Sequence, residues 1–138
     1  MQTINDKNLY RIVDANFNRA KEGLRVCEDI CRFVYDEKSQ TRKWKDLRHQ
    51  LTTVVSSFGV KKIVQSRNIQ GDVGKATTRT ELKRNQVADI FYANSQRVKE
   101  SIRVLEEFAK LLNKTKAREL KKIRYQIYAL EKKIVEKY

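Results

Sequence analysis

The sequence predicts an all-α bundle built from two duplicated helix-turn-helix hairpins, and two observations lead to this prediction. Apolar residues recur at spacings of three and four along most of the chain, which is the period of a helix with one buried face. A long segment is also repeated: residues 15–33 read "ANFNRAKEGLRVCEDICRF" and residues 93–111 read "ANSQRVKESIRVLEEFAKL". Because 138 residues suffice for one ordinary core, we expect a single domain over residues 1–138.

The first hairpin is predicted from two consecutive apolar stripes. The stripe of the first helix consists of Val13, Phe17, Ala20, Leu24, Cys27, Cys31 and Val34. The stripe of the second helix consists of Trp44, Leu47, Leu51, Val54, Val55 and Phe58. Ser39 is the expected N-cap of the second helix and Gly59 its C-cap. The two cysteines align with apolar residues of the second copy, so we interpret them as packing residues rather than a metal site or a disulfide.

The second hairpin follows a loop that contains two of the four glycines of the chain, "QGDVGKATT" at residues 70–78. We take the repeated units as 9–58 and 87–134, joined by a Gly-containing crossover loop at 59–78. Thr78 with Glu81 forms a capping-box pattern that predicts the start of the third long helix, and Thr115 is the expected N-cap of the fourth. A helical hairpin cannot bury both of its apolar faces alone, so the two halves are expected to pack together.

The charge of the chain predicts an anionic partner. Lys and Arg number 31 against 17 Asp and Glu, a formal net charge of +14. The partner could be nucleic acid, an anionic membrane surface or a phosphorylated small molecule. Net charge promotes association with all three and does not distinguish them. The chain has no apolar run of about 18 residues and its amino terminus has no signal-peptide core. We therefore expect a cytoplasmic protein with no membrane partner.

Several polar residues recur at matched positions of the two copies and form one set of site candidates. A side-chain amide on the apolar side of a helix is usually hydrogen-bonded within a structural network. The alternative is that it projects into a polar cleft between the two halves and binds a ligand. A row of charges on a helix is ordinarily a solvated surface row, but its recurrence favours contact with something. The repeated pairs are Asn16 with Asn94, Arg19 with Arg97, Arg25 with Arg103, and Glu28 with Glu106.

The crossover loop supplies the other candidates. "GDVGKAT" has the wrong glycine spacing for a Walker phosphate loop, and Ala76 stands where that loop needs a hydroxyl. What remains is a generic phosphate-binding composition, in which glycine amides, cations and a following helix start favour an anion. Its members are Arg67, Gly71, Gly74 and Lys75, and Asp72 is predicted either to hold a metal ion on the phosphates or to cap a turn. No arrangement of Ser, His and Asp indicates nucleophilic catalysis.

Four motifs, "DANFNRAKEGLRVCED", "GDVG", "AN..R..ES.RVLEE" and "LRH", closely resemble a known family. It is the monofunctional hydroxymethylpyrimidine phosphate kinase family of thiamine biosynthesis, a helical domain often fused ahead of thiamine-phosphate synthase. The resemblance covers residues 9–131, and the synthase barrel is missing, so the chain is expected to be a stand-alone enzyme. It implies transfer of the ATP γ-phosphoryl group to 4-amino-5-hydroxymethyl-2-methylpyrimidine phosphate, with Mg²⁺ as cofactor and ATP as co-substrate.

This resemblance assigns expected roles to the candidates, because phosphoryl transfer needs positioning and charge neutralisation more than a nucleophile. The expected catalytic residues are Asp72 and Arg67, and the expected metal ligands are Asp72, Glu28 and Glu106. The expected substrate- and phosphate-binding residues are Asn16, Arg19, Arg25, Gly71, Gly74, Lys75, Asn94, Arg97 and Arg103. The alternatives are a basic helical nucleic-acid-binding protein without catalytic activity and a purely structural helical adaptor. Nucleic acid is not the expected partner, and a homodimer is compatible with the sequence.

Overall fold

The structure is a computed structural model that describes residues 3–138, and it is all-α in this range, with no β-strand. A π-helical segment, η1 (Ile30–Val34), continues the first helix. The helices are α1 (Asp6–Asp29), α2 (Lys38–Ser56), α3 (Val60–Gln65), α4 (Arg79–Leu82), α5 (Val87–Ala109) and α6 (Lys114–Lys137). The all-α prediction is therefore confirmed. Over residues 3–138, no helix combines the length and the apolar character that crossing a membrane requires.

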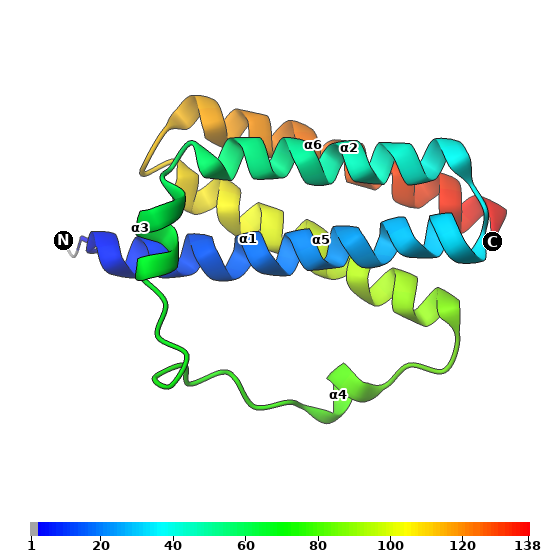
Figure 1. Cartoon of the computed structure of the whole chain (residues 1–138), viewed down its shortest axis with the longest axis horizontal. Coiled ribbons are helices and arrows are strands. Elements are labelled where there is room, and N and C mark those ends of the chain that lie inside the picture. The colour runs from blue at the N-terminus through cyan, green and yellow to red at the C-terminus, as the bar shows by residue number, and fades with distance from the viewer. Residues whose placement is uncertain (1–2) are drawn as a thin grey trace.

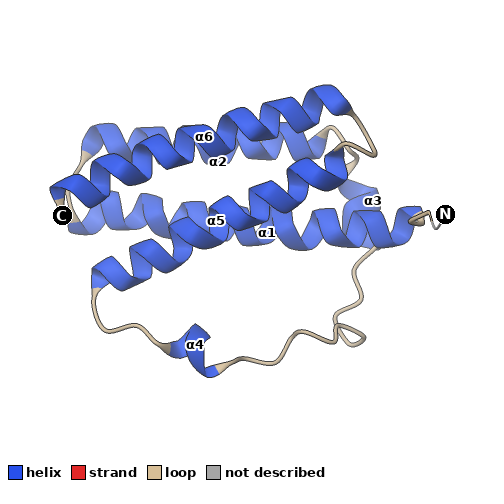
Figure 2. Cartoon of the chain, turned by 180° about the vertical axis from the view of Figure 1, so that it is seen from behind, coloured by secondary structure: helices blue, strands red, loops and turns tan. Residues whose placement is uncertain are grey.

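The four long helices form the bundle. Helix α1 packs against α2 and α5, and α6 packs against the same two helices on the other side. Figure 1 shows α1 and α2 side by side with α5 and α6 behind them, and Figure 2 shows the same arrangement from the back. In both views the segment between α3 and α5 leaves the bundle and carries the short α4. The division into two duplicated halves stays an inference from sequence.

The predicted apolar stripes supply the core. Trp44 of α2 and Phe91 of α5 are almost completely buried and meet edge to face, with ring centroids 5.9 Å apart. Each large apolar side chain buried in this way stabilises the fold by about 1.5–3 kcal/mol. Val34 departs from its predicted stripe and is half exposed. Val34 is the last residue of η1. The wider π-helical turn changes the spacing at which side chains return to the same face of the helix.

Both cysteines are free thiols buried in this core. Burial raises the pKa of the Cys31 thiol to about 11, and burial also raises the pKa of the Cys27 thiol. Because the thiolate is the reactive form, both thiols are unreactive near neutral pH. Their role as packing residues agrees with the sequence interpretation.

The helix caps differ from the sequence prediction. Asn113, not Thr115, caps α6, because its side chain accepts hydrogen bonds from the Thr115 and Lys116 amides. Ser39 lies inside α2, whose N-cap residue Glu37 makes no capping hydrogen bond with its side chain. The third long helix does not start at Thr78. Its capping box is formed by Gln86 and Asp89, and the predicted box at Thr78 begins only the four-residue α4.

The crossover is shifted along the chain relative to the predicted loop at 59–78. Helix α3 occupies its first residues and packs on α1, whereas residues 67–87 are exposed throughout. Gly59 precedes α3 with φ of 100°, a left-handed conformation that favours glycine. Neither Gly71 nor Gly74 has a positive φ. The backbone conformation at these two positions therefore does not require glycine.

A glycine does matter where α1 meets α5. A Cβ atom at Gly23 would lie 2.6 Å from Cγ2 of Val98 and 3.0 Å from the backbone oxygen of Asn94. The Val98 side chain can turn away, but the Asn94 carbonyl belongs to the helix backbone and cannot. Glycine at this position therefore lets the two helices approach closely.

We expect Gly23→Ala to lower the free energy of unfolding by about 1–2 kcal/mol, because overpacking outweighs the better helix propensity of alanine. Urea denaturation followed by circular dichroism measures this change. Gly74→Ala is the matched control, because the nearest atom to its new Cβ lies 3.6 Å away, an ordinary contact. Equal stability of the two variants would contradict a tight α1–α5 contact at Gly23.

Candidate functional site

A pocket lies between the first half of α1 and the start of the crossover. Its volume is about 550 Å³, within the range of about 300–1,000 Å³ typical of small-molecule sites. It lies at the end of the bundle where the chain begins and where α3 packs on α1. The lining residues are Ile4, Asn8, Arg11, Ile12, Asp14, Ala15, Asn16, Arg19, Arg67, Asn68, Ile69 and Asp72.

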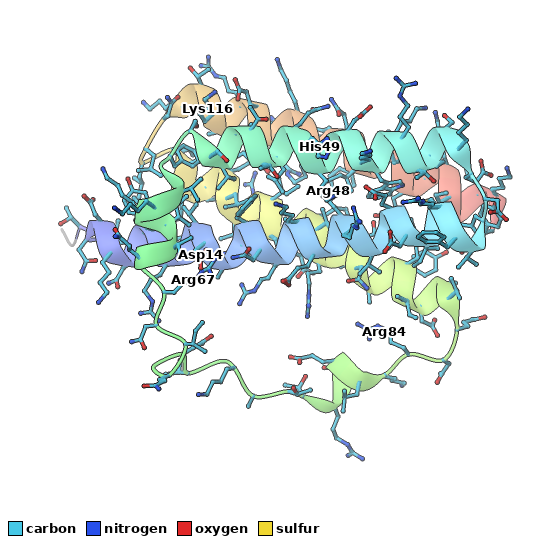
Figure 3. All side chains as sticks on the ribbon, viewed as in Figure 1. Asp14, Arg48, His49, Arg67, Arg84 and Lys116 are labelled. Atoms are coloured by element: carbon cyan, nitrogen blue, oxygen red, sulfur yellow. The ribbon has the colours of Figure 1, made fainter. Side chains whose placement is uncertain are left out.

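An ion pair joins the two walls of this pocket. The Arg67 guanidinium donates to both carboxylate oxygens of Asp14, from Nε at 2.7 Å and from Nη2 at 2.8 Å. Asn18 adds a hydrogen bond from Nδ2 to Asp14 Oδ1 at 3.1 Å. Figure 3 shows Asp14 and Arg67 meeting where the crossover leaves α3 and passes α1. The pair therefore fixes the first residues of the crossover against the helix.

The ion pair joins a nearly buried carboxylate to a partly exposed guanidinium. The Asp14 side chain is only 10% exposed, whereas that of Arg67 is 41% exposed. The hydrogen bonds to Asp14 raise the pKa of Arg67. A bidentate pair of this kind fixes orientation as well as distance. Because Asp14 is already satisfied by Arg67, it is not available to bind a metal ion in this arrangement.

Two further arginines, Arg11 and Arg19, add positive charge to the lining of the pocket. Among residues 3–138, neither Arg11 nor Arg19 forms an ion pair with a carboxylate. In the described part of the chain, the Arg19 side chain makes one hydrogen bond, a long one of 3.5 Å from Nη1 to Oδ1 of Asn16. The Asn16 amide nitrogen donates to the backbone oxygen of Ile12, which turns the amide oxygen toward Arg19. A planar guanidinium without a carboxylate partner is suited to bind phosphate bidentately.

Asp72 closes the crossover side of the pocket. Its Oδ1 accepts a hydrogen bond from the Gly74 amide at 2.9 Å, and Asn68 Oδ1 accepts one from the Gly71 amide, also at 2.9 Å. The Gly71 and Gly74 amides, which were predicted to face a ligand, thus donate hydrogen bonds within the loop. The other carboxylate oxygen of Asp72 has no hydrogen-bond partner within the described residues.

The structure brings together four of the predicted site residues: Asn16, Arg19, Arg67 and Asp72 line the same pocket. Gly71, Gly74 and Lys75 lie on the exposed crossover and are not among its lining residues. Asn94 and Arg97 lie on α5, outside the pocket. The Asn94 amide donates to the backbone oxygen of Ile90. The cleft predicted between the two halves therefore stays a prediction, because this pocket is lined from α1 and the crossover and not from α5.

The remaining predicted site residues belong to two similar ion-pair clusters inside the bundle. Glu28 of α1 accepts from Arg48 of α2 at 3.3 Å and from Arg25 at 3.2 Å. The side chain of Glu28 is 3% exposed, and Figure 3 shows Arg48 directed between the two helices. Arg25 also approaches Asp29, at 3.8 Å. This cluster therefore joins α1 to α2.

The second cluster occupies the equivalent place between α5 and α6. Glu106 accepts from Arg124 through Nη2 at 3.1 Å and through Nε, and this pairing raises the pKa of Arg124. Arg103 lies 4.0 Å from Glu106 and 3.1 Å from Glu107. Both buried glutamates are thus engaged by arginines, an arrangement that disfavours their predicted role as metal ligands. No group of three or more metal-binding side chains is found in residues 3–138.

Sequence reasoning missed Asp14, Arg11, Asn8 and Asn68, which also line the pocket. The predicted set was drawn from polar residues that recur in both copies and from the crossover loop. Asp14 aligns with Tyr92 and Arg11 with Asp89 in the second copy, so neither recurs. A signal was nevertheless present, because Asp14 begins the quoted motif "DANFNRAKEGLRVCED".

Fold and pocket together define a small helical domain with a cationic pocket at one end of its bundle. Residues 11–133 match the ThiD2 family, and the chain belongs to that family. Relatives named thiamine-phosphate synthase are 37% identical in Nostoc punctiforme, 37% identical in Synechocystis sp. and 39% identical in Prochlorococcus marinus strain AS9601. The matches cover 92%, 95% and 91% of this chain. No solved structure matches the chain.

These comparisons correct the family assignment drawn from sequence resemblance. The matching family is ThiD2, and the relatives bear the name of a synthase, so the assignment to a monofunctional kinase family is wrong. The chain spans about a third of the length of these relatives, with 35%, 37% and 35% of each covered. Its homology to part of such proteins ties it to thiamine biosynthesis.

Proposed function

We propose that the pocket binds a phosphorylated pyrimidine of thiamine biosynthesis and that the chain transfers the γ-phosphoryl group of ATP to its phosphate. The observation that carries the proposal is the position of Arg11 and Arg19, which form no ion pair within residues 3–138, beside side-chain amides and apolar groups in one pocket. Cations serve the phosphate, whereas Asn8, Ile12 and Ile69 offer hydrogen bonds and apolar contact to a small ring. This combination is typical of sites for small phosphorylated ligands.

The reaction joins two anions, so its main requirement is charge neutralisation. An oxygen of the pyrimidine monophosphate attacks the γ-phosphorus of ATP, the bond from that phosphorus to the bridging oxygen breaks, and ADP leaves. The substrate 4-amino-5-hydroxymethyl-2-methylpyrimidine phosphate becomes the diphosphate. Arg11 and Arg19 bind the attacking phosphate and reduce its repulsion from the nucleotide. Arg67 and Asp14 act as positioning residues, because they hold the crossover wall against α1.

Mg²⁺ is proposed to enter with the nucleotide phosphates. Such ions are usually held by one or two carboxylates together with substrate phosphates, and they neutralise charge on those phosphates. Asp72 is the pocket carboxylate that no arginine engages, so it is the proposed ligand. One carboxylate would hold the ion on the protein side. The same side chain also accepts a hydrogen bond from the Gly74 amide within its turn.

The test is to incubate the protein with ATP, Mg²⁺ and the pyrimidine monophosphate and to follow the diphosphate by ³¹P NMR. We expect turnover, and we expect Arg19→Gln to lower kcat/KM about 10- to 100-fold through loss of a charge-assisted contact. Arg97→Gln is the matched control, because Arg97 is the sequence counterpart of Arg19 but lies outside the pocket. Absence of diphosphate from the wild-type protein, or equal losses in the two variants, would refute the proposal.

A further inference from the structure

A second cationic pocket lies at the opposite end of the bundle, where η1 turns into α2. Its volume is about 430 Å³. Four of its lining side chains are cations: Arg32, Lys38, Arg42 and Lys45. The turn between η1 and α2 and the end of α6 lie together at this end in Figure 1, away from α3 and the first pocket. We propose that this pocket is a binding site for a polyphosphate anion, such as the phosphate chain of a nucleotide.

No carboxylate neutralises the four cations. None of them forms an ion pair or a side-chain hydrogen bond within residues 3–138. Lys38, Arg42 and Lys45 follow one another at spacings of four and three on α2, so they share one face of the helix. Like charges at such spacings destabilise a helix. A bound anion would remove this repulsion.

The two acids of the pocket do not compensate this charge. Glu37 is engaged by the end of α6, because its Oε1 accepts hydrogen bonds from Lys137 and, at 2.8 Å, from the Tyr138 hydroxyl. These contacts, the one with Lys137 first, lower the pKa of Glu37. Asp36 is exposed, and no ion pair joins it to a cation in the described part of the chain. Four cations therefore face one free carboxylate.

The chemistry of the site favours phosphate groups over a single carboxylate. A phosphate carries about 1.5–2 negative charges near neutral pH, so two or three linked phosphates match the excess of cations. Arg32 and Arg42 offer planar forks that can each bind two phosphate oxygens, whereas the two lysines act as point charges. The Arg32 guanidinium also stacks on the Phe33 ring, 4.7 Å from its centroid, which limits its freedom before a ligand arrives.

This site is distinct from the one proposed for phosphoryl transfer. Arg32 lies about 27 Å from Asp14 along the helix, by the usual rise of about 1.5 Å per residue. Reacting atoms must approach within about 3–3.5 Å, so a ligand held here cannot donate to a substrate in the first pocket. The second site therefore binds an anion without taking part in that transfer.

Calorimetric titration with sodium tripolyphosphate, and separately with ATP, at physiological salt tests this site. The protein carries Arg11→Gln and Arg19→Gln, which remove the two arginines of the first pocket that have no carboxylate partner and leave Arg67 paired with Asp14. We expect one mole of tripolyphosphate to bind per chain, and we expect Arg42→Gln with Lys45→Gln to weaken binding at least about 10-fold. Lys43→Gln with Lys122→Gln is the control, because it removes the same charge from exposed positions outside both pockets.

The outcomes separate the sources of the phosphate chain. Tighter binding of ATP than of tripolyphosphate would identify a nucleotide, and the reverse order would identify an inorganic polyphosphate. Failure of tripolyphosphate to bind would overturn the proposal. Equal weakening by the pocket variant and the control would also overturn it, because the attraction would then come from the net charge of +14 alone.

Discussion

Replacing Arg124 with methionine is expected to lower the free energy of unfolding by about 3–5 kcal/mol. The Glu106 carboxylate is 4% exposed, and Arg124 from the neighbouring helix binds both of its oxygens. Without Arg124 the charge on Glu106 stays buried, and the remaining approach of Arg103, at 4.0 Å from a side chain that is 57% exposed, is too weak to compensate it. Urea denaturation monitored by circular dichroism measures the change.

Two further variants separate the loss of the pair from the loss of packing. Arg103→Gln is expected to cost less than about 1 kcal/mol, because its ion pairs lie at the surface. Combining Glu106→Leu with Arg124→Met should recover much of the lost stability, since an apolar pair of similar volume leaves no buried charge. If the double variant were as unstable as Arg124→Met, the uncompensated charge of Glu106 would not be the cause.

The helices could be predicted from the sequence because their signal is local. The stripes through Leu24 in α1 and Leu51 in α2 repeat over many turns, so a single misplaced residue such as Val34 does not obscure them. Helix ends depend on one or two hydrogen bonds. Thr78 with Glu81 and Gln86 with Asp89 are both plausible starts for α5, and only tertiary packing selects the second.

The site was predicted in part, because repetition in sequence does not distinguish a ligand contact from a structural one. Glu28 and Glu106 recur in the sequence, and each pairs with an arginine between two helices of the bundle. Arg19 recurs as Arg97, but only Arg19 faces the start of the crossover. The crossover follows the first hairpin and completes a pocket on α1, which Arg97 of α5 does not line. Some pocket residues have no counterpart in the second copy, and Asp14 is the main example. Comparing the two copies could not find them.

Replacing Arg67 with methionine is expected to weaken binding of the pyrimidine monophosphate in the first pocket about 30- to 100-fold, or by about 2–3 kcal/mol. Two causes act together. The Asp14 carboxylate, at 10% exposure, loses its bidentate partner, and the crossover wall that carries Asn68, Ile69 and Asp72 loses its attachment to α1. The ligand then binds only the fraction of molecules in which the wall is in place, and its apparent affinity falls by that fraction.

The design of this experiment distinguishes positioning from direct contact with the ligand. Calorimetric titration gives the affinity, and Arg79→Gln is the control, because it removes one cation from the same crossover outside the pocket. If Arg67 acts through Asp14, then Asp14→Asn should weaken binding by a similar factor, and the double variant should lose little more than either single variant. Additive losses in the double variant, or unchanged affinity after Arg67→Met, would show that the ion pair does not hold the pocket together. A shared loss is expected because one bidentate contact joins the two walls, and removing either partner breaks the same connection.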